Sequence, residues 1–564
     1  MRRNRWVLAA VTAVAAVAPL ACSGTMSSQG EPQQLDAGAL ADRTAPFDAG
    51  SRTGSDAGAQ LAGEGGRRAA AGAASQAGSS AEDAAIARDA ASDAARDAAV
   101  PEMQYPAGPP GCGLSAAAFC ETFDQVAAAG LGEGRVGELD PRLWSGARMQ
   151  PGLNFGESAT PVRAATIPSC RADLPSRVYP GQDAVICDGN ERIQSRHLLM
   201  AAAEQSYGQL SLRIRRPFDF AGRTGTVVFD AEGELNGFLQ GWVSLAITAE
   251  PTPAPSFGIM QNFENGAVPR DGVEVHLFQI CGADDRVGVA QVNVFRDYAE
   301  TFYLDDQGGR SPICVQSEAG TLNHFELRIS RTHLEVWGSD RSPDGVTFGP
   351  LTRLFALDVE LPFERGYVHI NTHNHSSLKY SEDKVDAWVA RWDNVGFDGP
   401  VIGGLREHSV PDALEPVVID GADCRNIGYQ LGDVAEGPRQ TFTFRGVDPT
   451  GVTGAKIALD GHFNTHTDVP FTDYALRYRV NAGGWQELRF DAAQLALLSG
   501  PRVFDESGAN VRDGTGIAGA IALMLDVDPT SLVSGDNSLQ LVTSSIPNSY
   551  RPYAANIDLV LATH

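Results

Sequence analysis

Asp271-Gly-Val-Glu-Val-His-Leu-Phe-Gln-Ile-Cys281 is the stretch that decides the fold class, because its apolar residues alternate as they do in a strand. Successive side chains of a strand point to opposite faces of the sheet. One face of this stretch carries Val273, Val275 and Leu277. The opposite face carries Glu274, His276, Phe278 and Ile280. Ionisable groups are unusual inside a sheet, so we take Glu274 and His276 as candidate site residues.

Runs with the same alternation occur on both sides of this stretch. They are rich in β-branched and aromatic residues, are separated by Gly, Pro, Asp and Asn, and show little helical period. Examples are Gln209-Leu-Ser-Leu-Arg-Ile-Arg215, Gly241-Trp-Val-Ser-Leu-Ala-Ile-Thr248, Tyr367-Val-His-Ile-Asn-Thr372 and Tyr474-Ala-Leu-Arg-Tyr-Arg-Val480. This pattern predicts an all-β protein built from antiparallel sandwiches.

The length of the chain predicts more than one folded domain. About 450 residues follow residue 111, which exceeds one ordinary hydrophobic core. We expect two β-sandwich (jelly-roll) domains, at residues 112–401 and 405–564.

The N-terminal part is expected to direct and anchor the chain. In residues 1–21, three arginines precede an apolar run that ends near Leu20, which is typical of a secretory signal peptide. Cys22 follows Leu-Ala and resembles the lipidated cysteine of bacterial lipoproteins, although Pro19 stands where that family usually has Leu. Lipidation would make the chain an outer-membrane or cell-surface lipoprotein; ordinary cleavage nearby would leave it periplasmic or secreted.

Residues 22–111 are predicted to form a disordered tether. They are rich in Ala, Gly, Asp, Ser and Arg, and their few large apolar residues follow no period. Such a segment cannot bury enough apolar area to offset the entropy lost on ordering.

The net charge restricts the partners of the protein. It is -26 at pH 7, with an isoelectric point near 4.8. A surface this acidic repels nucleic acids and other polyanions unless a local patch overrides the average. We therefore expect no nucleic-acid partner.

Eight cysteines in an exported chain point to disulfides. With Cys22 lipidated, seven remain. The local pairings to try first are Cys112 with Cys120, Cys170 with Cys187 and Cys281 with Cys314, which would leave Cys424 over; spacing alone does not fix this connectivity.

Four segments of the first expected domain resemble the concanavalin A-like lectin/glucanase jelly roll, also seen in LamG-like domains. They are Phe119-Cys-Glu-Thr-Phe-Asp124, Leu139-Asp-Pro-Arg-Leu-Trp144, Arg213-Ile-Arg-Arg-Pro-Phe-Asp219 and Ala387-Trp-Val-Ala-Arg-Trp-Asp-Asn-Val-Gly-Phe-Asp398. The resemblance covers roughly 280 residues and rests on loose patterns. It implies that the first and last strands pair and that the concave sheet binds sugars.

The laminarinase-type hydrolases of that family carry a Glu-x-Asp-x-x-Glu strand, which supplies nucleophile, helper and acid/base. The matching positions here are Glu274, His276 and Gln279, so only the first agrees. Retaining hydrolysis needs two carboxyl groups about 5 Å apart. Gln279 cannot donate the proton, which disfavours this mechanism unless a carboxylate such as Glu264 or Asp386 comes from elsewhere in the fold.

A second polar stretch is Tyr367-Val-His-Ile-Asn-Thr-His-Asn-His375, in which His369, Asn371, His373 and His375 share one parity. If extended, these side chains project to one side and meet Glu274 and His276 on a concave face. Three interpretations stay open: a metal or lyase site, a sugar-facing groove, or a solvated strand end. Trp388 and Trp392 share one side of the closing strand and could stack on sugars, although a sandwich Trp is more often in the core.

Two features of the second expected domain suggest cations. Asp460, His462, Asn464, His466 and Asp468 alternate, as ligands on one strand face would, but a hydrophilic loop has the same pattern. Asp505, Asn510 and Asp513 could hold calcium, the only cofactor we consider, without EF-hand spacing. We assign no metal ligands on this basis.

Local signatures of phosphate loops, dinucleotide sites, serine-hydrolase elbows and zincin proteases are absent from the sequence. The leading expectation is therefore a secreted or lipid-anchored, non-catalytic surface protein that binds carbohydrate, a surface polymer or another extracellular ligand through its jelly roll. One alternative is a polysaccharide hydrolase or lyase with its site around Glu274 and His276. Another is an adhesion or structural module without a sugar site.

Overall fold

The computed structural model describes twenty segments of the chain between residues 107 and 563. They are residues 107–127, 135–149, 164–167, 169–174, 177–180, 183–203, 209–232, 241–253, 267–278, 286–304, 313–318, 320–341, 347–374, 387–411, 414–419, 422–427, 429–462, 475–499, 520–544 and 553–563. The predicted signal peptide, Cys22 and nearly all of the predicted tether lie outside these segments. No helix in the described segments is long and apolar enough to cross a membrane.

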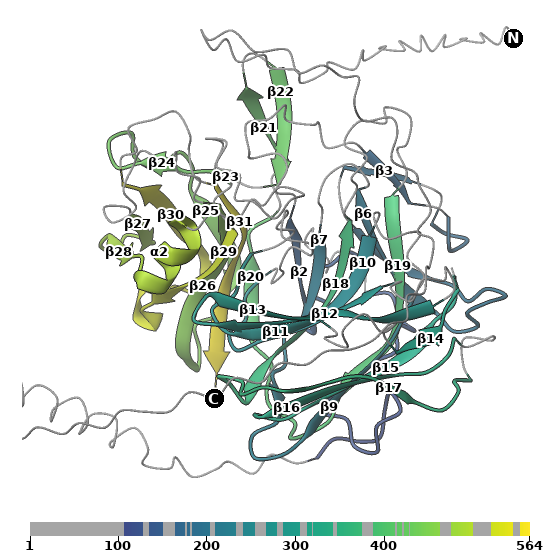
Figure 1. Cartoon of the computed structure of the whole chain (residues 1–564). Helices are drawn as coiled ribbons and strands as arrows, with labels where there is room; N and C mark the ends of the chain where they lie inside the picture. Colours follow the sequence, from purple (N-terminus) through teal and green to yellow (C-terminus); the bar gives the residue numbers. More distant parts are fainter. Residues whose placement is uncertain are drawn as a thin grey trace, which may run out of the picture. The chain divides into compact units, whose positions relative to one another are not determined.

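Two large antiparallel sheets form the first sandwich (Figure 1). The eight-stranded sheet has the order β17 (Thr352–Asp358), β16 (His333–Gly338), β15 (Asn323–Ile329), β9 (Gly225–Ala231), β19 (Ala387–Phe397), β6 (His197–Ala203) and β5 (Asp183–Cys187), and β1 (Phe119–Glu121) pairs with β19. The first strand of the described segments thus pairs with the last strand of this sheet, Phe119 opposite Phe397.

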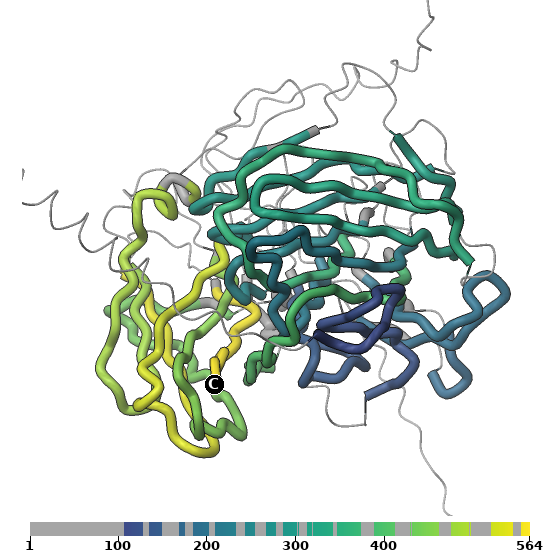
Figure 2. The backbone as a smooth tube through the Cα atoms, turned by 90° about the horizontal axis from the view of Figure 1, so that it is seen from below, coloured from purple at the N-terminus to yellow at the C-terminus, as the bar shows by residue number. Residues whose placement is uncertain are grey.

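The nine-stranded sheet has the order β13 (Ala299–Leu304), β12 (Arg286–Arg296), β11 (Gly272–Phe278), β10 (Gly241–Thr248), β18 (Arg365–Asn374), β7 (Gln209–Ile214) and β2 (Trp144–Met149). Two short strands extend it: β14 (Cys314–Gln316) pairs with β12, and β8 (Phe218–Asp219) pairs with β18. The longer strands of both sheets run side by side (Figure 2). A separate hairpin joins β3 (Ala164–Ile167) to β4 (Arg177–Pro180).

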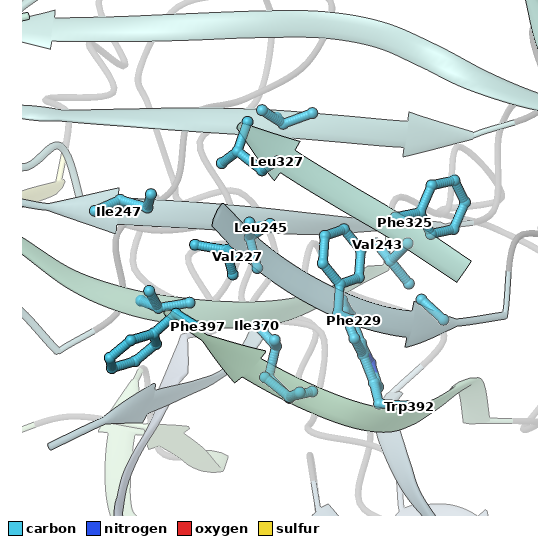
Figure 3. Close-up of a cluster of buried hydrophobic side chains, with 14 of the residues drawn as sticks. Val227, Phe229, Val243, Leu245, Ile247, Phe325, Leu327, Ile370, Trp392 and Phe397 are labelled. Carbon is cyan, nitrogen blue, oxygen red and sulfur yellow. The ribbon is translucent and has the colours of Figure 1, made fainter. Parts of the chain in front are cut away.

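Alternating apolar residues from both sheets fill the space between them. Val227 and Phe229 of β9 share this core with Val243, Leu245 and Ile247 of β10 (Figure 3). Each of these side chains is at most 1% exposed. Burial of one such side chain stabilises the fold by about 1.5–3 kcal/mol, which is why the alternation of the sequence fixes which face of each strand turns inward.

The second sandwich also has two sheets. One has the order β20 (Arg406–Ser409), β31 (Tyr553–Thr563), β26 (Val452–His462) and β29 (Ala520–Val527), with β23 (Tyr429–Gln430) paired to β31. The other has the order β24 (Gly432–Asp433), β30 (Gly535–Thr543), β27 (Ala475–Val480) and β28 (Gln486–Arg489), with β25 (Phe442–Val447) paired to β30. The helix α2 (Ala492–Ser499), the 3-10 turn η4 (Pro529–Ser531) and the hairpin of β21 (Leu414–Ile419) and β22 (Ala422–Ile427) complete this part.

The prediction of an all-β protein with antiparallel sandwiches is confirmed. The pairing of β24 with β30 is parallel and α2 is the one α-helix in the described segments, so the exceptions are small. A separate apolar cluster fills the second sandwich, and it includes Phe295 and Tyr298 from the β12–β13 hairpin. The hairpin of one sandwich therefore ends inside the core of the other.

Two of the expected disulfides are present. Cys112 is bonded to Cys120, and Cys170 to Cys187. Cys314 is also disulfide-bonded, but its expected partner Cys281 lies outside the described residues. The described residues thus contain oxidised cysteines.

Candidate functional site

The candidate site lies on the nine-stranded sheet, on the face that turns away from the sandwich core. In β11, Val273, Val275 and Leu277 are all part of the core cluster. The period of the strand then places Glu274 and His276 on the opposite face. Both side chains have no exposed area. A buried sheet face that carries ionisable side chains is therefore a real feature of the fold.

Neighbouring strands add polar groups beside these two residues. Ser244 of β10 stands between His276 of β11 and Asn371 of β18. In the next row, Ala246 stands between Glu274 and His369. We call the set of Ser244, Glu274, His276, Asn293, His369, Asn371 and His373 the polar layer; each residue in it is 0% exposed.

Glu274 is the centre of the contacts in the polar layer. Its carboxylate accepts a hydrogen bond from Ser244 Oγ at 2.5 Å and one from Asn371 Nδ2 at 3.5 Å. His276 Nε2 lies 3.1 Å from Oε2, and His373 Nε2 lies 3.6 Å from Oε1. The small side chain of Ala246 beside Glu274 leaves room for these groups to converge from three strands.

The hydroxyl of Ser244 connects the carboxylate to the amide and the second imidazole. Its oxygen is 3.1 Å from Asn371 Nδ2, which donates to it, and 2.9 Å from His373 Nε2. On the other side, Asn293 Nδ2 of β12 lies 3.1 Å from His276 Nε2. The polar layer thus crosses four adjacent strands and is held by its own contacts.

A β-bulge in β12 brings Asn293 into this layer. His276 pairs with Gln291 but Leu277 pairs with Val289, so Ala290 is an extra residue on β12. An extra residue reverses the alternation of a strand. As a result, Val289 and Val292 both face the core on the two sides of the bulge, and Gln291 and Asn293 share the outer face.

His369 lies at the edge of the layer, beside a charged pair. Its Nε2 is 2.9 Å from Thr248 Oγ1, and its Nδ1 is 3.4 Å from Ser211 Oγ. The paired residue on β7 is Arg213, which donates two hydrogen bonds of 2.9 Å to the carboxylate of Glu407 on β20. The second sandwich therefore contacts the same sheet face that carries the polar layer.

Burial and charge set the protonation states here. Burial alone would raise the pKa of Glu274, but His276 and His373 outweigh it and hold that pKa well below its usual range. Burial lowers the pKa of His373, and burial together with the nearby Arg213 lowers the pKa of His369 far below its usual value. At neutral pH, Glu274 is therefore ionised, while His369 and His373 are neutral.

The structure corrects the expectation for Trp392. Its indole is completely buried between the two large sheets, 5.8 Å from the ring of Phe229, and its Nε1 donates to Thr372 Oγ1 at 3.4 Å (Figure 3). It belongs to the eight-stranded sheet and cannot stack on a sugar at the polar layer. The backbone of Trp388 pairs with Ala202 in the same sheet, and its side chain lies outside the described residues.

Most of the other candidate residues from the sequence lie outside the described residues. Gln279, Glu264, Asp386 and His375 lie outside the described residues. So do Asn464, His466 and Asp468, and the residues considered for calcium, Asp505, Asn510 and Asp513. Asp460 is buried in β26, where its carboxylate accepts a hydrogen bond of 2.7 Å from Asn556. In the described segments, no group of three or more His, Cys, Asp or Glu is arranged to hold a metal ion.

Sequence reasoning missed Ser244 and Asn293 as members of the polar layer. Each lies in a run that alternation assigns to a strand, and each is a polar residue at an inner position of that run. Ser244 could have been found from its parity, which opposes that of Val243 and Leu245. Asn293 could have been found in the same way, because its parity opposes that of Val292 and Val294.

No protein-family model and no curated protein matches the sequence. The chain is similar to solved structures, including a glycoside hydrolase family 16 endo-glucanase from Bacteroides ovatus (10% identity, 50% of this chain, 99% of that chain, TM-score 0.27). Another is the catalytic domain of a laminarinase from Thermotoga petrophila (10% identity, 50% and 96% covered, TM-score 0.26). A third is the carbohydrate recognition domain of Emp47p (11% identity, 43% and 96% covered, TM-score 0.23). These likenesses support no statement about activity.

The chemistry of the polar layer follows from its groups alone. It offers an ionised carboxylate, imidazoles, carboxamides and a hydroxyl, which together donate and accept hydrogen bonds. Such groups can form hydrogen bonds with a hydroxyl-rich molecule.

Proposed function

We propose that this chain is an exported protein that binds an extracellular carbohydrate at the polar layer of its nine-stranded sheet and does not cleave it. The observation that supports this most is the ionised carboxylate of Glu274 among imidazole, amide and hydroxyl groups. Sugar hydroxyls both donate and accept hydrogen bonds. A carboxylate, which only accepts, and groups such as Asn371 and His373 are complementary to them.

The sequence at the motif positions supports a non-catalytic role. A retaining glycosidase uses one carboxylate as nucleophile and a second carboxyl group, about 5 Å away, as acid and base. Glu274 has the charge state of a nucleophile, since its pKa is held low. At the place where the laminarinase-type motif has its acid, this sequence has Gln279, which cannot deliver a proton.

Burial of the layer restricts how a ligand reaches it. Glu274, His276 and His373 have no exposed area. Direct contact with a sugar therefore requires that part of the surrounding protein move aside. We expect association slower than the ordinary range of about 10⁵–10⁷ M⁻¹s⁻¹ for binding without such a change.

The test is a polysaccharide-array screen of the purified full chain for binding and for depolymerisation, with and without a chelator. Glu274→Gln should lose binding, because the amide replaces an acceptor oxygen with a donor. Glu326→Gln, on the other large sheet, is the matched control and should bind as the unmodified chain does. Retention of a glycan without new reducing ends or unsaturated products would support the proposal.

Two results would reject this proposal. New reducing ends or unsaturated products that disappear in Glu274→Gln would show a hydrolase or lyase instead. Failure to retain any polysaccharide would point to an adhesion or structural module. Sensitivity to the chelator in either assay would reveal a cation outside the residues described here.

We also infer that the chain is exported and anchored through a lipid on Cys22. The disulfides Cys112–Cys120 and Cys170–Cys187 support an oxidising compartment. In a cell fractionation, Cys22→Ser should move the protein from the membrane fraction to the soluble exported fraction. An unchanged distribution would leave ordinary cleavage as the explanation.

A further inference from the structure

A row of side chains crosses the outer face of the second sandwich, far in sequence from the polar layer. Arg479 of β27 pairs with Gln540 of β30. The pairing of Tyr478 with Gln486 sets Trp485 beside Arg479, at the start of β28. On the other side, the pairing of Phe442 with Leu539 sets Thr441 beside Gln540. We call Thr441, Gln540, Arg479 and Trp485 the transverse row.

Hydrogen bonds fix the polar members of the transverse row. Arg479 Nε donates to Gln540 Oε1 at 2.6 Å, and Gln540 Nε2 donates to Thr441 Oγ1 at 2.9 Å. Long side chains on a sheet surface normally keep their rotamer freedom, and fixing them costs entropy. Here the polar groups of three strands are already ordered before any partner binds, which lowers the cost of binding one.

Trp485 is the exposed aromatic residue of this row. Its side chain is 42% exposed, and it is the only aromatic among the large apolar residues of the described segments that are strongly exposed. The guanidinium of Arg479 lies 4.8 Å from the ring centroid. One face of the indole is therefore covered by a cation, and the exposed remainder is a flat apolar surface next to fixed polar groups.

The charge around the row is positive, although the whole protein is strongly acidic. Arg479 bonds to the neutral Gln540, so its charge is not neutralised within the row. In the adjacent row, Arg477 and Arg489 both donate to the single carboxylate of Glu487, at 2.7 Å each. On a chain of net charge -26, this is a local cationic surface.

We propose that the transverse row is a second carbohydrate site, which binds an acidic polysaccharide with a sugar ring stacked on Trp485 and its carboxylate paired with Arg479. A pyranose ring has an apolar face that matches the exposed indole. Arginine donates through a planar fork that fits a carboxylate, and Arg479 uses Nε alone in its contact with Gln540. This site is separate from the polar layer and does not depend on the function proposed for it.

The test compares the affinity of the full chain for polygalacturonate and for laminarin, an acidic and a neutral polysaccharide. We expect the acidic polymer to bind the unmodified chain more tightly, and binding to weaken as salt is added. Trp485→Ala and Arg479→Met should each lower the affinity for polygalacturonate by about tenfold or more. Trp485→Phe keeps a flat ring and should retain part of the affinity.

Controls separate this site from the polar layer and from loss of folding. Val533→Ala removes another exposed apolar side chain of the same sandwich, 50% exposed, and should leave binding unchanged. Glu274→Gln should also leave polygalacturonate binding at the row intact. Each variant is compared with the unmodified chain by thermal unfolding.

Three outcomes would overturn the inference. The first is that the unmodified chain does not bind polygalacturonate. The second is that Trp485→Ala and Trp485→Phe, both folded, bind it as the unmodified chain does. The third is that Arg479→Met loses laminarin and polygalacturonate binding equally, because the arginine would then not recognise the carboxylate.

Discussion

Arg213 on β7 and Glu407 on β20 form a two-point ion pair, with both hydrogen bonds 2.9 Å long and neither side chain exposed. Arg215 lies 3.4 Å from the same carboxylate. Burial would raise the pKa of Glu407, but Arg213 and Arg215 outweigh it and lower the pKa. A charged group of the second sandwich is thus held inside the face of the first that carries the polar layer.

Removal of the negative partner should therefore be costly. In Glu407→Gln, the charge of Arg213 stays buried without its compensating carboxylate, and we expect a loss of about 3–5 kcal/mol in the free energy of unfolding. Guanidinium chloride unfolding monitored by fluorescence measures this. Glu360→Gln breaks the exposed pair with Arg331 and should cost less than about 1 kcal/mol. Equal losses in the free energy of unfolding in the two variants would contradict the stabilising role of the buried ion pair.

Acid should destabilise the protein through His197. Burial lowers the pKa of this ring from 6.5 to about 4, despite its contact of 3.3 Å with the carbonyl of Ser195. The unfolded chain binds the proton first, so this contribution is complete above about pH 6.5 and is lost, by up to about 3 kcal/mol, between there and pH 4. Unfolding midpoints measured from pH 7 to 4 should fall less steeply in His197→Gln; parallel curves would exclude this role.

Alkali should destabilise the protein through His324. Burial lowers its pKa, but hydrogen bonds with Asp230 at 2.6 Å and with Glu326 outweigh burial and raise it to about 9. The charged ring stabilises the fold below its unfolded pKa, and this is lost as the pH rises through 9. His324→Gln should cost about 2 kcal/mol at pH 6 and much less at pH 10. His333→Gln, at an exposed pair with Asp358, serves as the control and should change little at either pH.

Trp392 should matter for stability and not for ligand binding. Its indole is fully enclosed by the core, so Trp392→Ala leaves a cavity and is expected to cost about 3–5 kcal/mol. Trp485→Ala, at an exposed ring, should cost less than about 1 kcal/mol. Chemical unfolding gives both values, and glycan binding per folded molecule should be unchanged in Trp392→Ala at the polar layer. A folded Trp392→Ala variant with normal stability and lost binding would restore its role as a sugar platform.

The disulfide between Cys170 and Cys187 should contribute measurably, since it closes a loop with a sequence separation of 17 residues. A cross-link of this span stabilises a fold by about 3 kcal/mol, because it restricts the unfolded chain. The double change Cys170→Ser with Cys187→Ser should therefore lower the free energy of unfolding by about this amount, and with it the unfolding midpoint. Added reductant should then have a smaller effect on the variant than on the unmodified chain. An unchanged midpoint in the variant would show that the bond does not restrain unfolding.

Local patterns predicted the fold, but not the contacts that depend on the assembled fold. The alternation around Val273 and Val275 was enough to place Glu274 and His276 together on one face, because strand geometry is set residue by residue. The parity of His369, Asn371 and His373 likewise placed them on one side, and the sheet order then brought them to Glu274.

The sequence could not predict features for which local patterns allow more than one placement. An apolar indole on an alternating strand faces either the core or a groove, and the sequence around Trp392 does not distinguish them. The pairing of Arg213 with Glu407, 194 residues apart, is decided by how two sandwiches pack and leaves no local pattern. The bulge at Ala290, which reverses the alternation between Val289 and Val292, leaves no local pattern either.

The β12–β13 hairpin has a consequence for how this protein could have evolved. Phe295 and Tyr298 end in the apolar cluster of the second sandwich, and the hydroxyl of Tyr298 donates to the carbonyl of Ala522 at 3.3 Å. If a genetic exchange replaced the C-terminal part by an unrelated module, these two aromatic side chains would be exposed to water. The two halves are therefore expected to be inherited together, and homologous chains that carry only one of them should have lost the aromatic residues of this hairpin.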